Sequence, residues 1–188
     1  MIAIPCGFSP EDYLVIERDS RVRHEYRCGL VYAMTGGSDN HNLISLNLVI
    51  EIGRPLRDRN CQFFVNDIKV SYRDRFFYYP DLFVTCDPRD RDDRYVKRYP
   101  KLIVEVLSPS TEKFDRHDKF ADYQLLDSLE EYVLISQERM EVECCRRVGE
   151  GPNSQWETEV YREGDLVRLQ SIGLEIAIEQ LYLGTILT

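Results

Sequence analysis

The most constraining feature of this 188-residue sequence is the run Leu102–Leu107, in which Glu105 is the only polar residue. A nearly continuous apolar run of this length is typical of a β-strand that is buried on both faces of a sheet. Burying an unpaired carboxylate is costly, so Glu105 must find a cation, accept hydrogen bonds or take up a proton. The run therefore predicts a central strand with a compensated acid in its middle.

A second carboxylate, Asp81, opens the apolar segment 81–85 directly after Pro80, a residue that is tolerated at the start of a strand. If the two strands are neighbours and their acids share an end, Asp81 and Glu105 can bind one hard cation through oxygen. Such an ion would keep positions for water and phosphate. The two acids therefore predict a hydrolytic metal site.

Lys119 lies on the next segment, which is polar but carries apolar residues at helical spacing. An ammonium near a metal-bound water can orient that water, or stabilise negative charge in a transition state. Asp115 stands one helical turn earlier, and an Asp–Lys pair at this spacing is more often a modest surface contact. The spacing alone leaves both interpretations open.

Hydrophobic periodicity places the other elements of what we expect to be a single domain, residues 1–188. Steps of three and four residues predict helices at about 10–18, 38–55 and 111–126. Apolar, aromatic and β-branched runs predict strands at 24–28, 30–34, 61–65, 68–72, 77–85, 132–136, 140–146, 155–161 and 166–169, with one more strand and a short helix from residue 173. The aromatic run 76–79 is expected to pack in the core.

Composition narrows the class of protein. No run reaches the roughly 18 apolar residues of a membrane helix, and residues 1–10 lack the pattern of a signal peptide, so we expect a cytoplasmic protein without membrane contact. The six cysteines show no Cys-x-x-Cys pair and are expected to be reduced structural thiols, with adjacent Cys144 and Cys145 on opposite faces of a strand.

A net charge of −9 argues against a surface that binds nucleic acid everywhere, so any DNA contact must be local. Basic residues do cluster at 54–59 and again at 89–101. The second cluster is interleaved with acids, and a solvated polar loop is as good an interpretation as a rail for phosphates.

A longer string of residues carries a resemblance to a known family. Its members are Pro80-Asp81, then, after 23 intervening residues, Glu105-Val106-Leu107-Ser108-Pro109-Ser110-Thr111, followed by Asp115, Lys119, Tyr123 and Glu131-Tyr132-Val133-Leu134. This string closely resembles the Uma-type family of restriction-endonuclease-like proteins, within the PD-(D/E)XK superfamily. The resemblance implies a mixed α/β (α+β) fold with a central mixed sheet flanked by helices. It also implies cleavage of phosphodiester bonds with magnesium, or manganese as its substitute, on Asp81 and Glu105.

The sequence departs from the superfamily pattern at Leu107, where a lysine usually follows the acid by two residues. The resemblance implies that Lys119 reaches the same place from the helix. Glu25 and His41 match polar positions in the N-terminal part of the family, where either can supply an auxiliary ligand or a supporting hydrogen bond. For His41, an exposed polar side chain near a helix start is the commoner outcome.

The leading hypothesis is therefore a magnesium-dependent endonuclease acting on DNA, with Asp81, Glu105 and Lys119 as catalytic residues. One active site cuts one strand, which makes a homodimer a reasonable expectation. A second hypothesis, motivated by Leu107 and the acidic composition, is a non-catalytic module that binds nucleic acid or protein. A third is a structural domain in which Glu105 pairs with an arginine.

Overall fold

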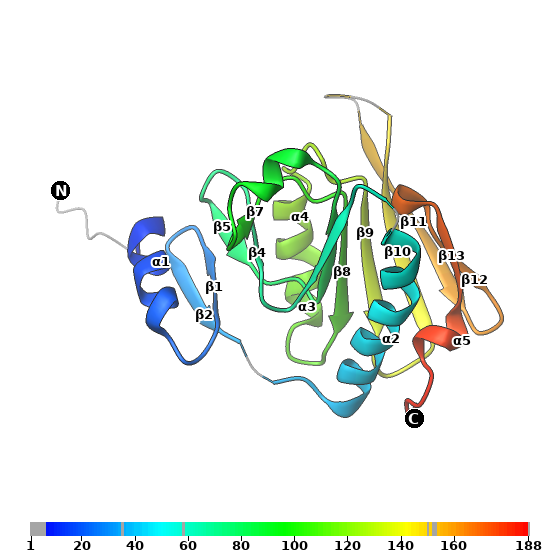
Figure 1. The fold of residues 1–188 in the computed structure, drawn as a ribbon. Coiled ribbons are helices and arrows are strands. Elements are labelled where there is room, and N and C mark those ends of the chain that lie inside the picture. The colour runs from blue at the N-terminus through cyan, green and yellow to red at the C-terminus, as the bar shows by residue number, and fades with distance from the viewer. Residues whose placement is uncertain (1–6, 35, 58, 150, 152–153, 188) are drawn as a thin grey trace.

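The computed structural model describes residues 7–34, 36–57, 59–149, 151 and 154–187. The central sheet has six strands in the order β11-β10-β9-β8-β6-β3, and those from β11 to β8 lie side by side in Figure 1. These strands are Gln155–Arg162 (β11), Glu141–Val148 (β10), Glu131–Ser136 (β9), Leu102–Leu107 (β8), Leu82–Thr85 (β6) and Gln62–Val65 (β3). β8 and β9 pair in parallel, whereas the other pairs are antiparallel. The sheet is therefore mixed, as predicted.

A second sheet has five strands in the order β2-β1-β5-β4-β7. They are Leu30–Ala33 (β2), His24–Arg27 (β1), Phe76–Tyr78 (β5), Lys69–Ser71 (β4) and Val96–Lys97 (β7). A small third sheet pairs Leu166–Leu169 (β12) with Leu174–Ala177 (β13). Two 3-10 helices span Pro88–Arg91 and Gln170–Ile172, and the helix α5 is Ile178–Leu181.

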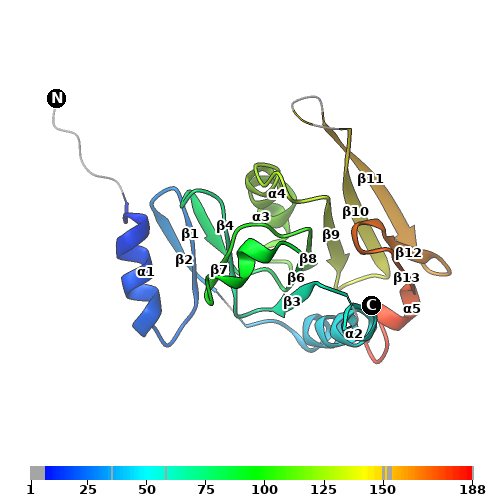
Figure 2. The same ribbon diagram turned by 45° about the horizontal axis from the view of Figure 1, so that its top comes forward.

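Helices cover both faces of the central sheet (Figure 2). One face carries α2 (Asp39–Leu56), which begins after the cap Ser38 as the sequence predicted. The other carries one continuous helical segment made of α3 (Glu112–Phe114), a π-helical turn (Asp115–Lys119) and α4 (Phe120–Tyr123). The helix α1 (Pro10–Asp19), also as predicted, begins after the cap Ser9, which forms a reciprocal capping box, and lies beside the hairpin of β1 and β2 (Figure 1).

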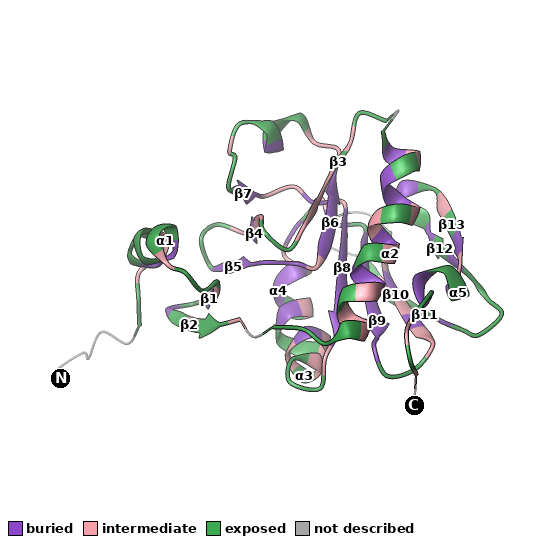
Figure 3. Ribbon diagram, turned by 60° about the horizontal axis from the view of Figure 1, so that its bottom comes forward, coloured by how far each residue is buried: buried purple, intermediate pink, exposed green. Residues whose placement is uncertain are grey.

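The strand β8 has the predicted bounds, and all six of its residues are buried. Its side chains alternate between two cores, because successive residues of a strand point to opposite faces. Val104 and Val106 pack in the core under α2, whereas Ile103 and Leu107 pack with Tyr123 of α4. Figure 3 shows the buried central strands between the half-exposed helices.

The predicted strand at 77–85 is instead two strands in different sheets, β5 and β6. Pro80 lies between them, and a proline has no N–H for a ladder hydrogen bond. Asp81 therefore lies just before β6 and does not open it. The aromatic run 76–79 is buried, as predicted, and belongs to the core.

The expectation of reduced cysteines is wrong for one pair. Cys61 and Cys86 form a disulfide, because β3 and β6 are antiparallel neighbours with Gln62 opposite Thr85, which brings the flanking cysteines together. Cys28, Cys144 and Cys145 are free thiols, and Cys6 lies outside the described residues. Cys144 and Cys145 pack in opposite cores, as predicted.

Across the described part of the chain, no helix combines the length and the apolar character that crossing a bilayer requires.

Candidate active site

Asp81 and Glu105 lie side by side where β6 begins and β8 nears its end. Because Leu82 stands opposite Val104 in this antiparallel pair, continuing the register by one residue sets Asp81 opposite Glu105. The backbone N–H of Val106 donates to Asp81 Oδ2 at 2.7 Å, and the N–H of Asp81 donates to Glu105 Oε2 at 3.4 Å. Each carboxylate is thus tied to the strand that carries the other.

Lys119 points into this site and is surrounded by carboxylates. Its Nζ lies 3.0 Å from Glu105 Oε1, 3.1 Å from Glu25 Oε1 and 3.5 Å from Asp115 Oδ1. All four side chains are buried. The interpretation of Asp115 and Lys119 as a surface pair is therefore wrong, and Glu105 is paired with a lysine and not with an arginine.

The π-helical turn gives Lys119 its direction. The turn after β8 begins the helical segment, because the N–H of Glu112 donates to the carbonyl of Ser108 at 2.8 Å. Three residues after Glu112 the backbone widens from α-helical to π-helical geometry over Asp115–Lys119, and π-helical turns occur often at functional sites. An ideal α-helical wheel could not have placed Lys119, since the periodicity changes within the segment.

Leu107 takes no part in the site. It lies two residues after Glu105 on the same face of β8, but it is 3 % exposed and packs in the core with Ile103 and Tyr123. A lysine at this position would place its stem where core side chains now pack. The structure therefore puts the only ammonium within reach of Glu105, among the described residues, on the helix.

Two side-chain donors hold Glu105 by its Oε1 atom. The Tyr123 hydroxyl donates to Oε1 at 3.2 Å, and Lys119 contacts the same oxygen. Burial raises the pKa of Glu105 well above its usual range, Lys119 opposes that shift, and Asp115 and Asp81 add to it. Burial lowers the pKa of Lys119, but the carboxylates around it, Glu105 foremost, raise that pKa well above its usual range. The lysine therefore stays charged.

His41 stands on the other side of Asp81, in the first turn of α2. Its Nε2 lies 3.3 Å from Asp81 Oδ2, and its side chain is 18 % exposed, so the expectation of an exposed polar residue is wrong. Ser38 fixes this end of the helix, because its Oγ accepts the backbone N–H of His41 at 3.1 Å. Burial lowers the pKa of His41, but the hydrogen bond to Asp81 and the charge of that carboxylate outweigh burial and raise it.

Glu25 lies on β1 and contacts Lys119 directly. Its Oε1 accepts the backbone N–H of Tyr79 at 2.9 Å and contacts the Lys119 ammonium. Sequence reasoning grouped Glu25 with His41 as auxiliary residues, but only His41 touches Asp81. It gave no catalytic role to Asp115, whose signals were its spacing from Lys119 and its place in the family-like string, or to Tyr123, which was noted for its place in that string.

The carboxylates described above, with Lys119 and His41, line a cavity of about 700 Å³ between the hairpin, the start of α2 and the π-helical turn. Its wall carries the carboxylates of Glu25, Asp67, Asp81, Glu105, Asp115 and Asp118, and the cations Arg23, Arg27 and Lys119, with His41. The arginines already pair with acids, Arg23 with Asp67 and Arg27 with Asp118. Negative charge is therefore in excess around the buried acids.

A divalent cation fits the chemistry of Asp81 and Glu105. Both offer carboxylate oxygen, the ligand that magnesium and manganese prefer, and an added positive charge would relieve the repulsion among the buried acids. No group of three His, Cys, Asp or Glu side chains within the described residues could hold a metal ion. The two acids would therefore share the ion with water and substrate phosphate, as magnesium sites commonly do.

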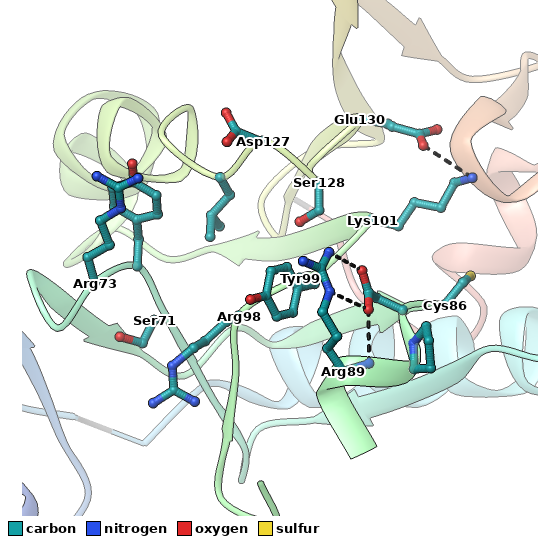
Figure 4. A pocket seen from close by; sticks show the side chains of 14 residues that line it. Ser71, Arg73, Cys86, Arg89, Arg98, Tyr99, Lys101, Asp127, Ser128 and Glu130 are labelled. Atoms are coloured by element: carbon teal, nitrogen blue, oxygen red, sulfur yellow. Dashed lines mark hydrogen bonds and ion pairs between the residues drawn. The ribbon is translucent and has the colours of Figure 1, made fainter. Parts of the chain in front are cut away.

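A second cavity, of about 690 Å³, lies at the opposite end of β6 and β8 and contains part of the basic cluster at 89–101 (Figure 4). Lys101 pairs there with Glu130, and Arg89 pairs with Asp87 while its guanidinium lies 3.6 Å from the centre of the Tyr99 ring. Because these two cations have acidic partners, this part of the cluster fits the polar loop better than the phosphate rail.

Comparisons with known proteins identify the family of the chain and its fold. A family model named Uma2 and described as "Putative restriction endonuclease" matches residues 10–179. The chain belongs to the Uma2 family. The match covers the hairpin, both carboxylates and the helical segment that bears Lys119.

Two uncharacterized proteins of Synechocystis sp. resemble this Uma2 chain. The protein slr1290 is 40% identical over 177 residues, which cover 94% of this chain and 92% of the relative. The protein sll1609 is 32% identical over 142 residues, or 74% of this chain and 80% of the relative.

A crystal structure from Anabaena variabilis, titled "putative nuclease belonging to DUF820", matches with a TM-score of 0.77 at 18% identity. The match covers 93% of this Uma2 chain and 97% of the other. The fold is restriction-endonuclease-like, as predicted.

Proposed function

We propose that this Uma2 protein is a metal-dependent endonuclease that hydrolyses phosphodiester bonds of DNA, with Asp81 and Glu105 as ligands of magnesium or manganese. The observation that carries the proposal is the buried Lys119 ammonium 3.0 Å from Glu105, with Asp81 on the neighbouring strand. Membership of a nuclease-like family and the fold support it.

Each residue of the site has a defined task in this proposal. The bound cation would polarise the phosphate and increase the acidity of water. Lys119, held in place by Glu25 and Asp115, orients the attacking water and stabilises the charge that develops on the phosphoryl oxygens. Glu25 thus acts on the reaction through Lys119. His41 positions the Asp81 carboxylate by its hydrogen bond.

Cleavage of plasmid and linear DNA in magnesium or manganese tests the proposal. We expect the parent protein to cut, and Asp81→Ala to lose on the order of a hundredfold or more in rate, because the site then loses a charge-bearing ligand. Asp87→Ala is the matched control, since Asp87 lies at the other cavity, and it should cut like the parent. If the parent and Asp81→Ala are equally unable to cut DNA, the enzymatic claim fails.

The second candidate is a non-catalytic module that binds nucleic acid or protein. The apolar Leu107 and the net charge of −9 favour it. Calorimetry separates the two: no magnesium binding at millimolar concentration, together with DNA binding that is unchanged in Asp81→Ala, would support the module.

We also propose that the enzyme acts as a homodimer, since two sites related by symmetry can cut both strands of a duplex. Sedimentation of the parent protein tests this, and a monomer at all working concentrations would contradict it.

A further inference from the structure

One aromatic ring lies on the wall of the acidic cavity with no part in the site described so far. Tyr32 of β2 is 42% exposed and lines the cavity. It stands directly opposite Glu25 in the β1–β2 hairpin, and opposed residues of antiparallel strands share a face at about 5 Å between Cβ atoms. Since Glu25 contacts Lys119, Tyr32 lies next to the catalytic constellation.

Tyr32 is exposed because the residues of the hairpin alternate between two faces with different surroundings. Tyr26 and Val31, directly opposite each other, pack with Tyr13 of α1 on one face. Tyr32 belongs to the other face, which meets the π-helical segment. There its ring is supported by Phe114, with ring centroids 6.0 Å apart and planes tilted by 41°. The ring is thus braced by a second aromatic side chain and still accessible from the cavity.

The groups around Tyr32 are suited to bind one nucleobase and the phosphate next to it. An aromatic face accepts any nucleobase by stacking, whereas acids with a divalent cation accept a phosphate. Tyr32 stands opposite Glu25, and Glu25 contacts Lys119, so the ring lies beside the residues that would hold the phosphate. In a duplex the base faces are covered by neighbouring pairs, so a stacking side chain reaches them only where a base is unpaired or turned out.

We propose that Tyr32 is a stacking platform for an unpaired base beside the phosphate that is cleaved, so that the substrate is single-stranded or locally unpaired DNA. This inference rests on the proposed nuclease function and assigns its substrate class. Tyr32 is a specificity-determining residue in this role.

The test compares binding of a fluorescein-labelled single-stranded oligodeoxynucleotide with the same sequence annealed to its complement. Fluorescence anisotropy is measured at fixed salt with calcium in place of magnesium. Tyr32→Ala should weaken binding of the single strand by about 5- to 100-fold, the usual range for losing one stacked base. Tyr32→Phe keeps the ring and should bind like the parent. Tyr95→Ala removes a tyrosine that is 70% exposed and outside the cavity, and it should also bind like the parent.

Two results would overturn the inference. One is single-strand binding by Tyr32→Ala that equals the parent. The other is an equal loss on the single strand and the duplex, which would indicate a general disturbance of the cavity. Circular dichroism confirms that each variant is folded, as expected for a change at an exposed side chain.

Cleavage assays in magnesium, run beside the binding assays, keep the two proposals apart. A parent that binds single strands through Tyr32 but cuts no DNA would refute the nuclease and leave Tyr32 as a platform for binding an unpaired base. Cleavage with no preference for unpaired DNA, unchanged in Tyr32→Ala, would retain the nuclease and refute the platform.

Discussion

The two ends of the strand pair β6 and β8 carry cavities of similar size and opposite character. The cavity at Asp81 holds one ammonium, Lys119, among three buried carboxylates. In the cavity at the far end, Arg89 and Lys101 have their own acidic partners, and these pairs are at least partly exposed. At the first end, buried acids outnumber the lysine that they contact. At the second end, each of these two cations has its own acidic partner near solvent.

This difference singles out the buried acids around Lys119 as an arrangement that packing alone does not explain. Like charges that are buried together are costly, and such groups with shifted pKa values gather at functional sites. Exposed pairs contribute little to stability and need no further explanation. The imbalance around Lys119, more than the number of charges, therefore distinguishes the candidate active site from the second cavity.

The largest effect on stability is expected at Lys119. Lys119→Met should lower the free energy of unfolding by about 3–5 kcal/mol, because it leaves buried carboxylates without their cation. Lys101→Met, the matched change at the other cavity, should cost about 1 kcal/mol or less, since its pair with Glu130 is partly exposed. Urea unfolding at neutral pH measures both. Equal losses would erase the distinction between the two ends.

The disulfide provides the next largest effect, at the balanced end. Cys86 lines the second cavity, and the bridge to Cys61 closes a loop with a sequence separation of 25. Replacing both cysteines by serine should cost about 2–4 kcal/mol, because the unfolded chain regains its freedom. Magnesium binding, measured by calorimetry, should be unchanged. A loss of magnesium binding would show that the two ends are coupled.

Magnesium should give the smallest effect, and only at the unbalanced end. At about ten times the dissociation constant, the ion should stabilise the parent by about 1.4 kcal/mol, or about 3–6 °C in Tm for a chain of this size. Asp81→Asn should remove the shift, Asp87→Asn should keep it, and a chelator should reverse it. A shift that persists in Asp81→Asn would place the ion elsewhere.

Local signals in the sequence determined much of the fold and part of the site. The apolar run at 102–107 became β8 with the same bounds, and Ser9 and Ser38 begin helices as predicted. These elements could be predicted because caps and hydrophobic periodicity act over a few residues. Glu105 and Asp81 also followed from their neighbours in the chain, and the family resemblance implied the role of Lys119 beside them.

Only the tertiary structure decided how these parts meet. The π-helical turn directs Lys119 inward, β1 brings Glu25 to it, and α2 brings His41 to Asp81. The Cys61–Cys86 bridge likewise depends on the pairing of β3 with β6. These contacts join residues far apart in the chain, and their geometry follows from strand register and helix placement. No local pattern encodes either, because both depend on how the whole core packs.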